Sequence, residues 1–460
     1  MVTVTIDDKK IEVPEGTTVL NAARKAGIEI PTLCDHPQLQ PYGGCRLCLV
    51  EVEGARTLQP SCTMPVSDNM VVHTENEKIR ESRKFVLSMI FSERNHFCPY
   101  CQVSGGDCEL QNAAYDEGMT HWPLQPNWQP YPVDASHPFI IIEHNRCILC
   151  RRCVRACGEL VGNFTLGIEE RGANSKLMAD LGTPLGESTC IGCGTCVQVC
   201  PTGAMIDRWS AYQGKETEVE SHKTTCVGCS VGCSLDVLTR DNRLVRIEGD
   251  WEGTTNQGLL CEIGRFTPMG EERNRVLTPM VRKDGGLKAA TWDEAYAVIA
   301  DKLGSVSEGN KQIASFISTR LPIESMYFFK QIFKDNLKAK TATIVNGYLK
   351  GSRNLVGEYG MAASLDDVKH ADCAVVIGED ITKDHQVVSF FVKRNLPAGT
   401  KLITVSKEKD GLDNFAHVSI KNVKLADAIK QLASDLKALE IMKASQNLVF
   451  IFGGHAAECE

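Results

Sequence analysis

Two stretches of the chain repeat one spacing of cysteines, CILCRRCVRAC at residues 147–157 and CIGCGTCVQVCP at residues 190–201. In each stretch two residues separate the first three cysteines, and a fourth follows after three more. The chain has 460 residues and 21 cysteines, of which 19 fall before residue 262 in five groups; Cys373 and Cys459 stand alone. The first eight residues have neither the basic start nor the apolar run of a secretion signal. We therefore expect the grouped thiols to bind metal rather than to form disulfides.

The overall composition excludes several classes of protein. Hydrophobic residues make up 43% and charged residues 23% of the chain, which is ordinary globular usage and rules out a largely disordered chain. The formal net charge of -8 argues against nucleic acid as the main partner. No apolar run approaches the ~20 residues of a membrane-spanning helix. A cytoplasmic, reducing location is expected.

The repeated stretch has the spacing of bacterial two-cluster ferredoxins, in which the fourth cysteine of each run ligates the cluster of the other run. One [4Fe–4S] cluster is then expected on Cys147, Cys150, Cys153 and Cys200, and a second on Cys190, Cys193, Cys196 and Cys157. The first run ends in Cys157-Gly158 where proline is usual, and the 32 residues between the runs exceed the gap of a compact ferredoxin. A zinc ribbon does not need this spacing.

The first cysteine group suits a [2Fe–2S] cluster. Residues 2–13 alternate as a hairpin would, and Thr18 can cap a helix that Gly27 ends. The group then follows in a loop with a C-x2-C pair and one further thiol on each side: Cys34, Cys45, Cys48 and Cys62. A zinc site with four cysteines is the alternative.

The second group has only three cysteines, Cys98, Cys101 and Cys108, after a helix expected over residues 76–91. His96 lies two residues before the first of them and is our candidate for the fourth ligand, because imidazole suits iron. The alternatives are a surface role for His96, with His121, His144 or water completing the site. A neutral histidine ligand would raise the potential of the cluster.

The fifth group is Cys226, Cys229, Cys233 and Cys261. Apolar residues at 235–247 around Asp241-Asn242 predict a small antiparallel β unit between these cysteines. Four thiolates so arranged suit a further [4Fe–4S] cluster, with zinc as the alternative.

Residues 1–210 resemble the iron–sulfur chain shared by the large iron–sulfur subunit of respiratory complex I, the diaphorase of NAD-reducing hydrogenases, and NAD(P)-linked formate dehydrogenases. The resemblance is carried by GCRLCLVEVEG at 44–54, NHFCPYC at 95–101, CELQ at 108–111 and the double run. From about residue 219 the chain resembles the start of the molybdopterin oxidoreductases, through the fifth group, GRF at 264–266, LTP at 277–279 and TWDEA at 291–295.

The C-terminal part departs from that second family. The family's metal-ligating cysteine would fall near residues 341–357, which contain no cysteine, and Cys373 reads as a buried strand thiol. Ile263 stands where the family commonly has a lysine between cluster and pterin. We therefore expect no molybdenum- or tungsten-pterin. Helical patterns at 292–303, 323–333 and 425–441 alternate with apolar runs at 313–317, 373–377, 402–405 and 448–452, which predicts an α/β layer with a mostly parallel sheet.

Together these patterns predict a multidomain α+β chain. The expected parts are a β-grasp [2Fe–2S] domain at 1–75, a one-His/three-Cys [4Fe–4S] domain at 76–136, a 2[4Fe–4S] ferredoxin-like domain at 137–215, a small β [4Fe–4S] domain at 219–275, and a truncated molybdopterin-oxidoreductase-like α/β domain at 276–460.

No G-x-G-x-x-G follows an expected strand and no P-loop occurs, so the chain shows no substrate or nucleotide site of its own. The expected function is an electron relay with one [2Fe–2S] and four [4Fe–4S] clusters. The resemblance implies a flavoprotein partner that carries FMN and uses NAD(H) or NADP(H), a thioredoxin-like [2Fe–2S] subunit, and ferredoxin or another redox subunit, in an oxidoreductase complex of a kind that can bifurcate electrons. Arg146, Arg151, Arg152 and Arg155 could form a basic docking patch or neutralise cluster charge. A catalytic molybdenum or tungsten formate dehydrogenase and a non-enzymatic zinc protein are the alternatives.

Overall fold

The computed structural model describes the chain except residues 272–273, 309–311, 346–362, 454–455 and 457–460. Cys459 and most of the region 341–357 lie outside the described residues. The chain divides into two compact units, one formed by Met1–Met269 with Ala363–Phe452 and the other by Gly270–Ala362 with Gly453–Glu460. Among the described helices none is both long and apolar enough to cross a membrane.

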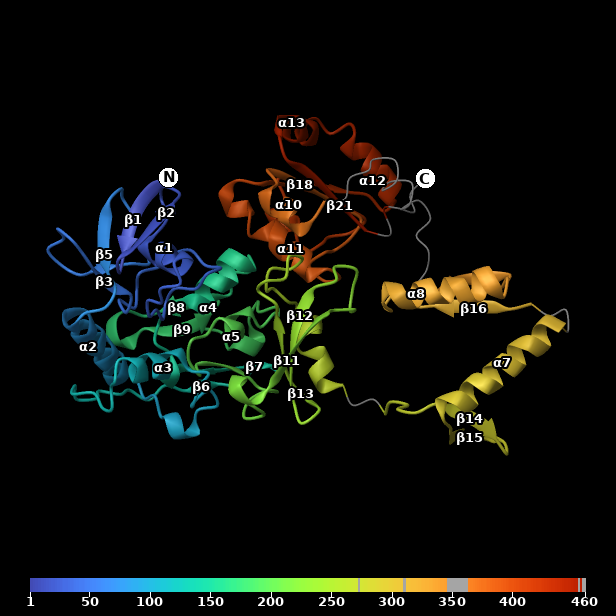
Figure 1. The fold of residues 1–460 in the computed structure, drawn as a ribbon. Helices are drawn as coiled ribbons and strands as arrows, with labels where there is room; N and C mark the ends of the chain where they lie inside the picture. Colours follow the sequence, from blue (N-terminus) through green and yellow to red (C-terminus); the bar gives the residue numbers. More distant parts are fainter. Residues whose placement is uncertain (272–273, 309–311, 346–362, 454–455, 457–460) are drawn as a thin grey trace. The chain divides into compact units, whose positions relative to one another are not determined.

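The N-terminal region of the first unit is a five-stranded sheet in the order β2-β1-β5-β3-β4, with one helix against it (Figure 1). The predicted hairpin is confirmed, because β1 and β2 pair antiparallel around a turn at Asp7 and Asp8, both with positive φ. The predicted cap is also confirmed: the Thr18 side chain accepts from the Asn21 amide, and Gly27 follows the helix with a φ of 66°. The elements are β1 (Val2–Ile6), β2 (Lys9–Val13), α1 (Val19–Lys25), β3 (Leu49–Val52), β4 (Gln59–Pro60) and β5 (Met70–His73).

The second region is helical. The helix expected over 76–91 is present, and its Asn76 side chain caps it by accepting from the Ile79 amide. The elements are α2 (Glu77–Glu93), η1 (Cys98–Tyr100) and α3 (Glu109–Asp116).

The region of the repeated cysteine runs places a short helix inside or directly after each run, α4 (Arg152–Arg155) followed by η3 (Ala156–Leu160), and α5 (Thr195–Gln198). The long insertion between the runs is accounted for by an antiparallel hairpin, β8 (Leu166–Glu169) with β9 (Lys176–Ala179). A three-stranded sheet joins the two ends of the region: β6 (Val133–Asp134), β7 (Ile140–Glu143) and β10 (Met205–Asp207), and η2 (His144–Arg146) leads from β7 into the first run. The remaining short helices are η4 (Gly172–Asn174), η5 (Leu185–Glu187) and η6 (Glu216–Glu218).

The predicted antiparallel β unit of the fifth group is confirmed and gains a third strand. Its sheet has the order β11-β12-β13, and Asp241 and Asn242 turn between the last two strands with positive φ. The elements are β11 (Glu220–Thr225), β12 (Ser234–Arg240), β13 (Arg243–Gly249), α6 (Glu262–Arg265) and η7 (Thr267–Gly270).

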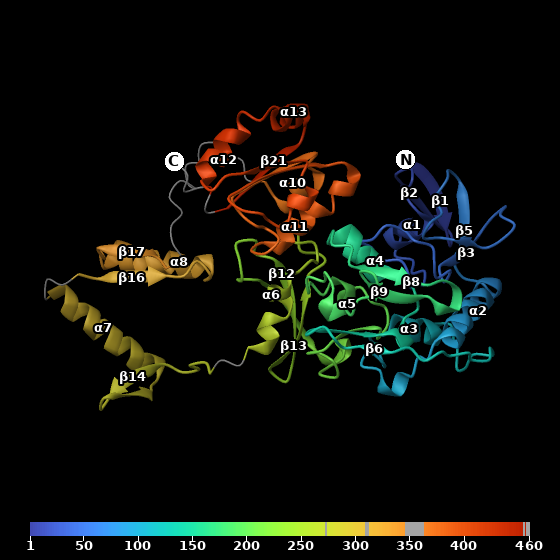
Figure 2. The same ribbon diagram turned by 180° about the vertical axis from the view of Figure 1, so that it is seen from behind.

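The C-terminal part of the first unit is a four-stranded parallel sheet in the order β20-β19-β18-β21. Figure 2 shows this part with β21 and its helices labelled. Cys373 is fully buried in β18, as expected for a strand thiol. The helix expected over 425–441 is instead two helices, because the Asp435 side chain caps a new start by accepting from the Ala438 amide. The elements are α10 (Leu365–His370), β18 (Cys373–Ile377), α11 (Gln386–Lys393), η9 (Leu396–Ala398), β19 (Lys401–Ser406), η10 (Asp413–Phe415), β20 (Val418–Lys421), α12 (Leu425–Leu432), α13 (Leu436–Ala444) and β21 (Leu448–Phe452).

The second unit contains two small sheets. The strand expected near 313–317 is present, but it pairs in parallel with β17 and does not join the four-stranded sheet. The elements are β14 (Met280–Lys283), β15 (Gly286–Ala289), α7 (Trp292–Glu308), β16 (Ala314–Ile317), α8 (Ile323–Phe329), η8 (Lys330–Asn336) and β17 (Thr341–Ile344).

One apolar core joins distant parts of the first unit. It includes Leu160 and Val199 beside the cysteine runs, Leu235 of β12, and Phe390 and Phe391 of α11. Burial of two phenylalanines is worth several kcal/mol, on the order of 1.5–3 kcal/mol each. The C-terminal sheet is therefore packed against the cysteine-rich regions, with α11 and α10 among the elements that make the contact.

Candidate metal-cluster sites

The four cysteines of the first group converge in the loop between α1 and β5. The Cys45 amide donates to the Cys34 sulfur at 3.4 Å. Hydrogen bonds from the Cys45 and Cys62 thiols hold the pKa of Cys34 far below its usual value, and a hydrogen bond from Cys62 lowers the pKa of Cys48 to about 7. The same contacts raise the pKa values of Cys45 and Cys62. These four thiols lie close enough to hydrogen-bond and to shift one another's pKa values. They form a donor set that fits a small cluster.

The second group forms a pocket that contains the candidate histidine. His96 and the three cysteines, Cys98, Cys101 and Cys108, line it together. The His96 Nε2 atom is buried and has no hydrogen-bond partner. Burial, with Arg146 and Arg94 nearby, lowers the pKa of His96 to about 4, so the ring is neutral at physiological pH.

The two other histidines considered for this site lie elsewhere. His121 is exposed and contacts Thr120, and neither His121 nor His144 lines the pocket. Gly203 has no side chain and so leaves room in the pocket wall for the Cys101 sulfur. A Cβ at this position would lie 2.5 Å from that sulfur. An unpartnered imidazole nitrogen beside three thiols fits a cluster with one histidine and three cysteine ligands.

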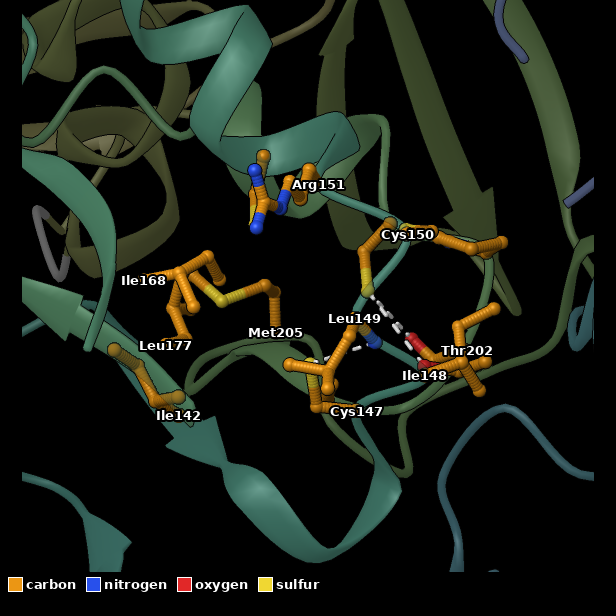
Figure 3. Close-up of a pocket in the computed structure, with 14 residues that line it drawn as sticks. Ile142, Cys147, Ile148, Leu149, Cys150, Arg151, Ile168, Leu177, Thr202 and Met205 are labelled. Carbon is orange, nitrogen blue, oxygen red and sulfur yellow. Dashed lines mark hydrogen bonds between the residues drawn. The ribbon is translucent and has the colours of Figure 1, made fainter. Parts of the chain in front are cut away.

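The first run and the last cysteine of the second run share one pocket. Its lining contains Cys147, Cys150, Cys153 and Cys200. Figure 3 shows Cys147 and Cys150 on one loop, with Ile142, Ile168, Leu177 and Met205 forming the apolar wall. Burial raises the pKa of Cys147 to about 11, and the Cys200 thiolate adds to the rise. The structure thus brings together the crossed set that the spacing predicts.

The reciprocal set is also close in space. Burial raises the pKa of Cys190 to about 12, and the thiolates of Cys193 and Cys157 contribute. Burial also raises the pKa of Cys196 well above its usual value, with contributions from Cys193, Cys190 and Cys157. The Cys200 thiolate, which belongs to the other crossed set, also raises the pKa of Cys196. The two crossed sets are therefore neighbours.

The fifth group gathers at one end of the three-stranded sheet. The Cys226 amide donates to the Cys233 carbonyl at 2.8 Å, and the Cys261 sulfur caps α6 by accepting from the Gly264 amide at 3.4 Å. A Cβ on Gly264 would lie 3.7 Å from the Cys226 sulfur and 3.8 Å from the Cys261 sulfur, so both sulfurs face one point. Burial raises the pKa of Cys233 to about 12, and the thiolates of Cys226, Cys261 and Cys229 add to it.

A tighter arrangement for a single ion is not seen. Within the described residues no three side chains of His, Cys, Asp or Glu form a group that could hold one metal ion.

The four arginines around the first run do not form a surface patch. Arg152 is 3% exposed and binds Glu109 through both guanidinium nitrogens, at 2.5 and 2.7 Å. Arg155 donates to the backbone carbonyls of Gln40 and Cys34, while Arg146 donates to those of residues 97 and 100 at 3.2 and 3.4 Å. Only Arg151 is exposed. Three of the four therefore connect neighbouring cysteine regions through hydrogen bonds.

Comparison with known protein families covers the chain from end to end. Family models match as follows: a 2Fe-2S iron-sulfur cluster binding domain at 1–77, the NADH-ubiquinone oxidoreductase-G iron-sulfur binding region at 83–122, the ferredoxin-like domain of NADH-quinone oxidoreductase subunit 3 at 137–206, the molybdopterin oxidoreductase Fe4S4 domain at 219–269, and molybdopterin oxidoreductase at 275–458.

The homologues of the chain include subunits of NADH-quinone oxidoreductases. It is 35% identical to an NADH-quinone oxidoreductase subunit of Rhizobium meliloti over 92% of this chain and 50% of that protein. It is 31% identical to subunit 3 of the Thermus thermophilus enzyme, over 82% of this chain and 51% of the relative. The NADPH-Fe(3+) oxidoreductase subunit alpha of Geobacter sulfurreducens is 31% identical over 92% of this chain and 50% of its own length.

These matches confirm the predicted resemblance and the multidomain fold with ferredoxin-like and molybdopterin-type domains. They also confirm domains for both 2Fe–2S and 4Fe–4S clusters. The chain spans about half the length of the curated relatives it matches. The expected absence of pterin stays a prediction, since a molybdopterin oxidoreductase model matches 275–458.

Two cationic residues beside the cysteine sets were not predicted from the sequence. Arg265 belongs to the GRF motif at 264–266, so the sequence singled out this residue. The motif did not indicate which residues Arg265 contacts. Lys393 ends α11, and its contact with Asn163 joins residues 230 positions apart. No local pattern could have indicated the second contact.

Proposed function

We propose that the chain is an iron–sulfur electron-relay subunit of an NAD(P)H-linked oxidoreductase complex. The observation that carries the proposal is the gathering of five donor sets within one compact unit, two of them in crossed register. Bound clusters would supply one-electron carriers, while the chain sets their burial and spacing.

The proposed ligand sets follow the geometry. The [2Fe–2S] cluster takes Cys34, Cys45, Cys48 and Cys62, and the four [4Fe–4S] clusters take His96 with Cys98, Cys101 and Cys108; Cys147, Cys150, Cys153 and Cys200; Cys157, Cys190, Cys193 and Cys196; and Cys226, Cys229, Cys233 and Cys261. Arg155 connects the first set to the repeated runs, because it binds the Cys34 carbonyl from α4. Such short through-protein connections support transfer from set to set.

The proposed partners are redox proteins at the two ends of the relay. They are an FMN flavoprotein that exchanges electrons with NAD(H) or NADP(H), a thioredoxin-like [2Fe–2S] subunit, and ferredoxin or a second catalytic subunit, in the cytoplasm. The printed names of the relatives, an NADH-quinone and an NADPH-Fe(3+) oxidoreductase, support the nicotinamide link.

Metal and sulfide analysis tests the relay directly. Anaerobically reconstituted protein should hold about 18 iron atoms and as many acid-labile sulfides, the content of one [2Fe–2S] and four [4Fe–4S] clusters. A colourless protein with zinc and no sulfide would overturn the relay in favour of a zinc protein.

A catalytic molybdenum or tungsten formate dehydrogenase is the second candidate, because a molybdopterin oxidoreductase model matches 275–458. It requires stoichiometric molybdenum or tungsten and dye-linked formate oxidation by the native protein. The relay without pterin predicts neither, and detection of both would replace it.

Replacing His96 with cysteine is expected to lower the reduction potential of the second cluster while the cluster still assembles. The reason is that a thiolate adds negative charge where a neutral imidazole stood. An EPR-monitored redox titration measures the shift, and His121→Cys, an exposed histidine from the same region, is the control. An unchanged potential in the His96 variant would assign the fourth ligand to another group.

A further inference from the structure

Arg265 contacts the loop that carries two cysteines of one crossed set. It is 4% exposed, and its Nε donates to the Cys193 carbonyl at 2.9 Å. Its other nitrogens donate to the Ile247 carbonyl at 3.2 Å and to the Gln198 side chain at 2.6 Å. Gly194, with a φ of 69°, has no room for a Cβ because the Arg265 side chain occupies that space. The guanidinium is thus fixed against the loop between Cys193 and Cys196.

Lys393 reaches the same set from the C-terminal sheet. It is 7% exposed and its Nζ lies 3.3 Å from the Asn163 Oδ1 atom. A Cβ on Gly162 would lie 2.7 Å from the Lys393 Cβ, so the end of α11 rests on the segment that follows Cys157. Burial lowers the pKa of Lys393, and the thiolates of Cys193 and Cys157 oppose that change.

Both cations are buried without an ion-pair partner. Within the described residues, no carboxylate lies within ion-pair distance of Arg265 or Lys393, whose hydrogen bonds go to carbonyl and amide oxygens. The other crossed set has cations of its own, because buried Arg94 acts on Cys147 and Arg151 lines the pocket. Charges in a low-dielectric interior act more strongly than charges in water, so an unneutralised buried cation has the larger effect.

One carboxylate lies against the cysteine loop itself. Glu262 occupies the space beside Gly192, in the loop between Cys190 and Cys193, and its side chain is partly exposed. Solvent screens a partly exposed charge, so Glu262 offsets the two buried cations only in part.

Two further carboxylates act on Arg265 from beyond ion-pair distance. Glu248 and Asp207 both favour the charged form of Arg265 and so work against the burial that lowers its pKa. Each has a nearer partner, since Glu248 pairs with Arg246 at 2.6 Å and Asp207 accepts from the Trp209 amide at 2.9 Å. The charge of Glu248 is therefore partly compensated by Arg246, and neither carboxylate forms an ion pair with Arg265.

We propose that Lys393 and Arg265 are positioning residues that raise the reduction potential of the cluster on Cys157, Cys190, Cys193 and Cys196. This inference rests on the proposed relay. It gives the C-terminal sheet a role in electron transfer, because α11 supplies one of the two cations.

The test is a redox titration of the anaerobically reconstituted full chain, followed by EPR. In Lys393→Met, the midpoint potential of the Cys157 cluster should shift to a more negative value while that of the Cys147 cluster stays unchanged. Lys393→Arg, which keeps the charge, should stay near the parent value. Glu262→Gln, which removes the opposing charge, should shift the potential in the positive direction.

The control is Lys401→Met, an exposed lysine of the same C-terminal sheet, which should move neither potential. If Lys393→Met does not retain its iron, Lys393→Gln, which keeps a polar partner for Asn163, replaces it in the titration. Equal shifts of both clusters, or no shift of the Cys157 cluster, would overturn the inference. A protein without iron and sulfide would instead overturn the relay itself.

Discussion

Replacing Cys157 with alanine is expected to remove the cluster whose other three ligands lie more than 30 residues further along the chain. The expectation follows from the crossed register, because Cys157 stands with Cys190, Cys193 and Cys196, while its own run completes a pocket with Cys200. The variant should lose about four iron atoms, the content of one [4Fe–4S] cluster.

EPR of the reduced variant distinguishes the two registers. Its spectrum should match that of Cys190→Ala, and the signal removed by Cys147→Ala should remain. Cys373→Ala is the matched control, since that thiol is fully buried in β18 and belongs to none of the sets. Loss of the same signal in Cys157→Ala and Cys147→Ala would contradict the crossed register.

The local parts of the fold could be predicted from the sequence because their determinants are close together in the chain. The start and end of α1 follow from the Thr18 cap and from Gly27, and the turn between β12 and β13 follows from Asp241-Asn242. Each signal acts within four residues. The cysteine sets were predictable for a related reason, since their spacing is itself the constraint that a cluster imposes on a loop.

The parts that were not predictable depend on tertiary packing. The apolar run near 313–317 is compatible with a strand in any parallel sheet. Its pairing with β17 depends on tertiary contacts that the local sequence does not show. The pattern over 425–441 is helical throughout, but the side chain of Asp435 starts a second helix within it. The arginines of the first run could suggest a surface patch because a sequence shows charge but not burial, and Arg152 is buried and pairs with Glu109.

Arg94 is the residue whose removal should most disturb the link between two cluster regions. It follows α2 two residues before His96, and it is 2% exposed. Its guanidinium donates to the carbonyls of His144, at 2.8 Å, and of Ser175, and it covers the ring of Tyr131 at 4.4 Å. Since His144 begins the short helix that leads into Cys147, one side chain holds both the second group and the first run in place.

Arg94→Ala is therefore expected to destabilise both sites together. The His144 carbonyl keeps the Cys147 amide as a donor, whereas the part-buried Ser175 carbonyl loses the Arg94 donor, so the expected cost is about 1–3 kcal/mol. The measurement is iron content and EPR after gel filtration in mild urea, where the signals assigned to the His96 and Cys147 clusters should fade before those of the other clusters. Arg208→Ala is the matched control, because Arg208 also donates to two backbone carbonyls, of residues 135 and 137, but from an exposed position. Equal loss of every signal would mean that Arg94 stabilises the fold as a whole. Loss of the Cys147 signal alone would mean that Arg94 does not stabilise the site of the second group.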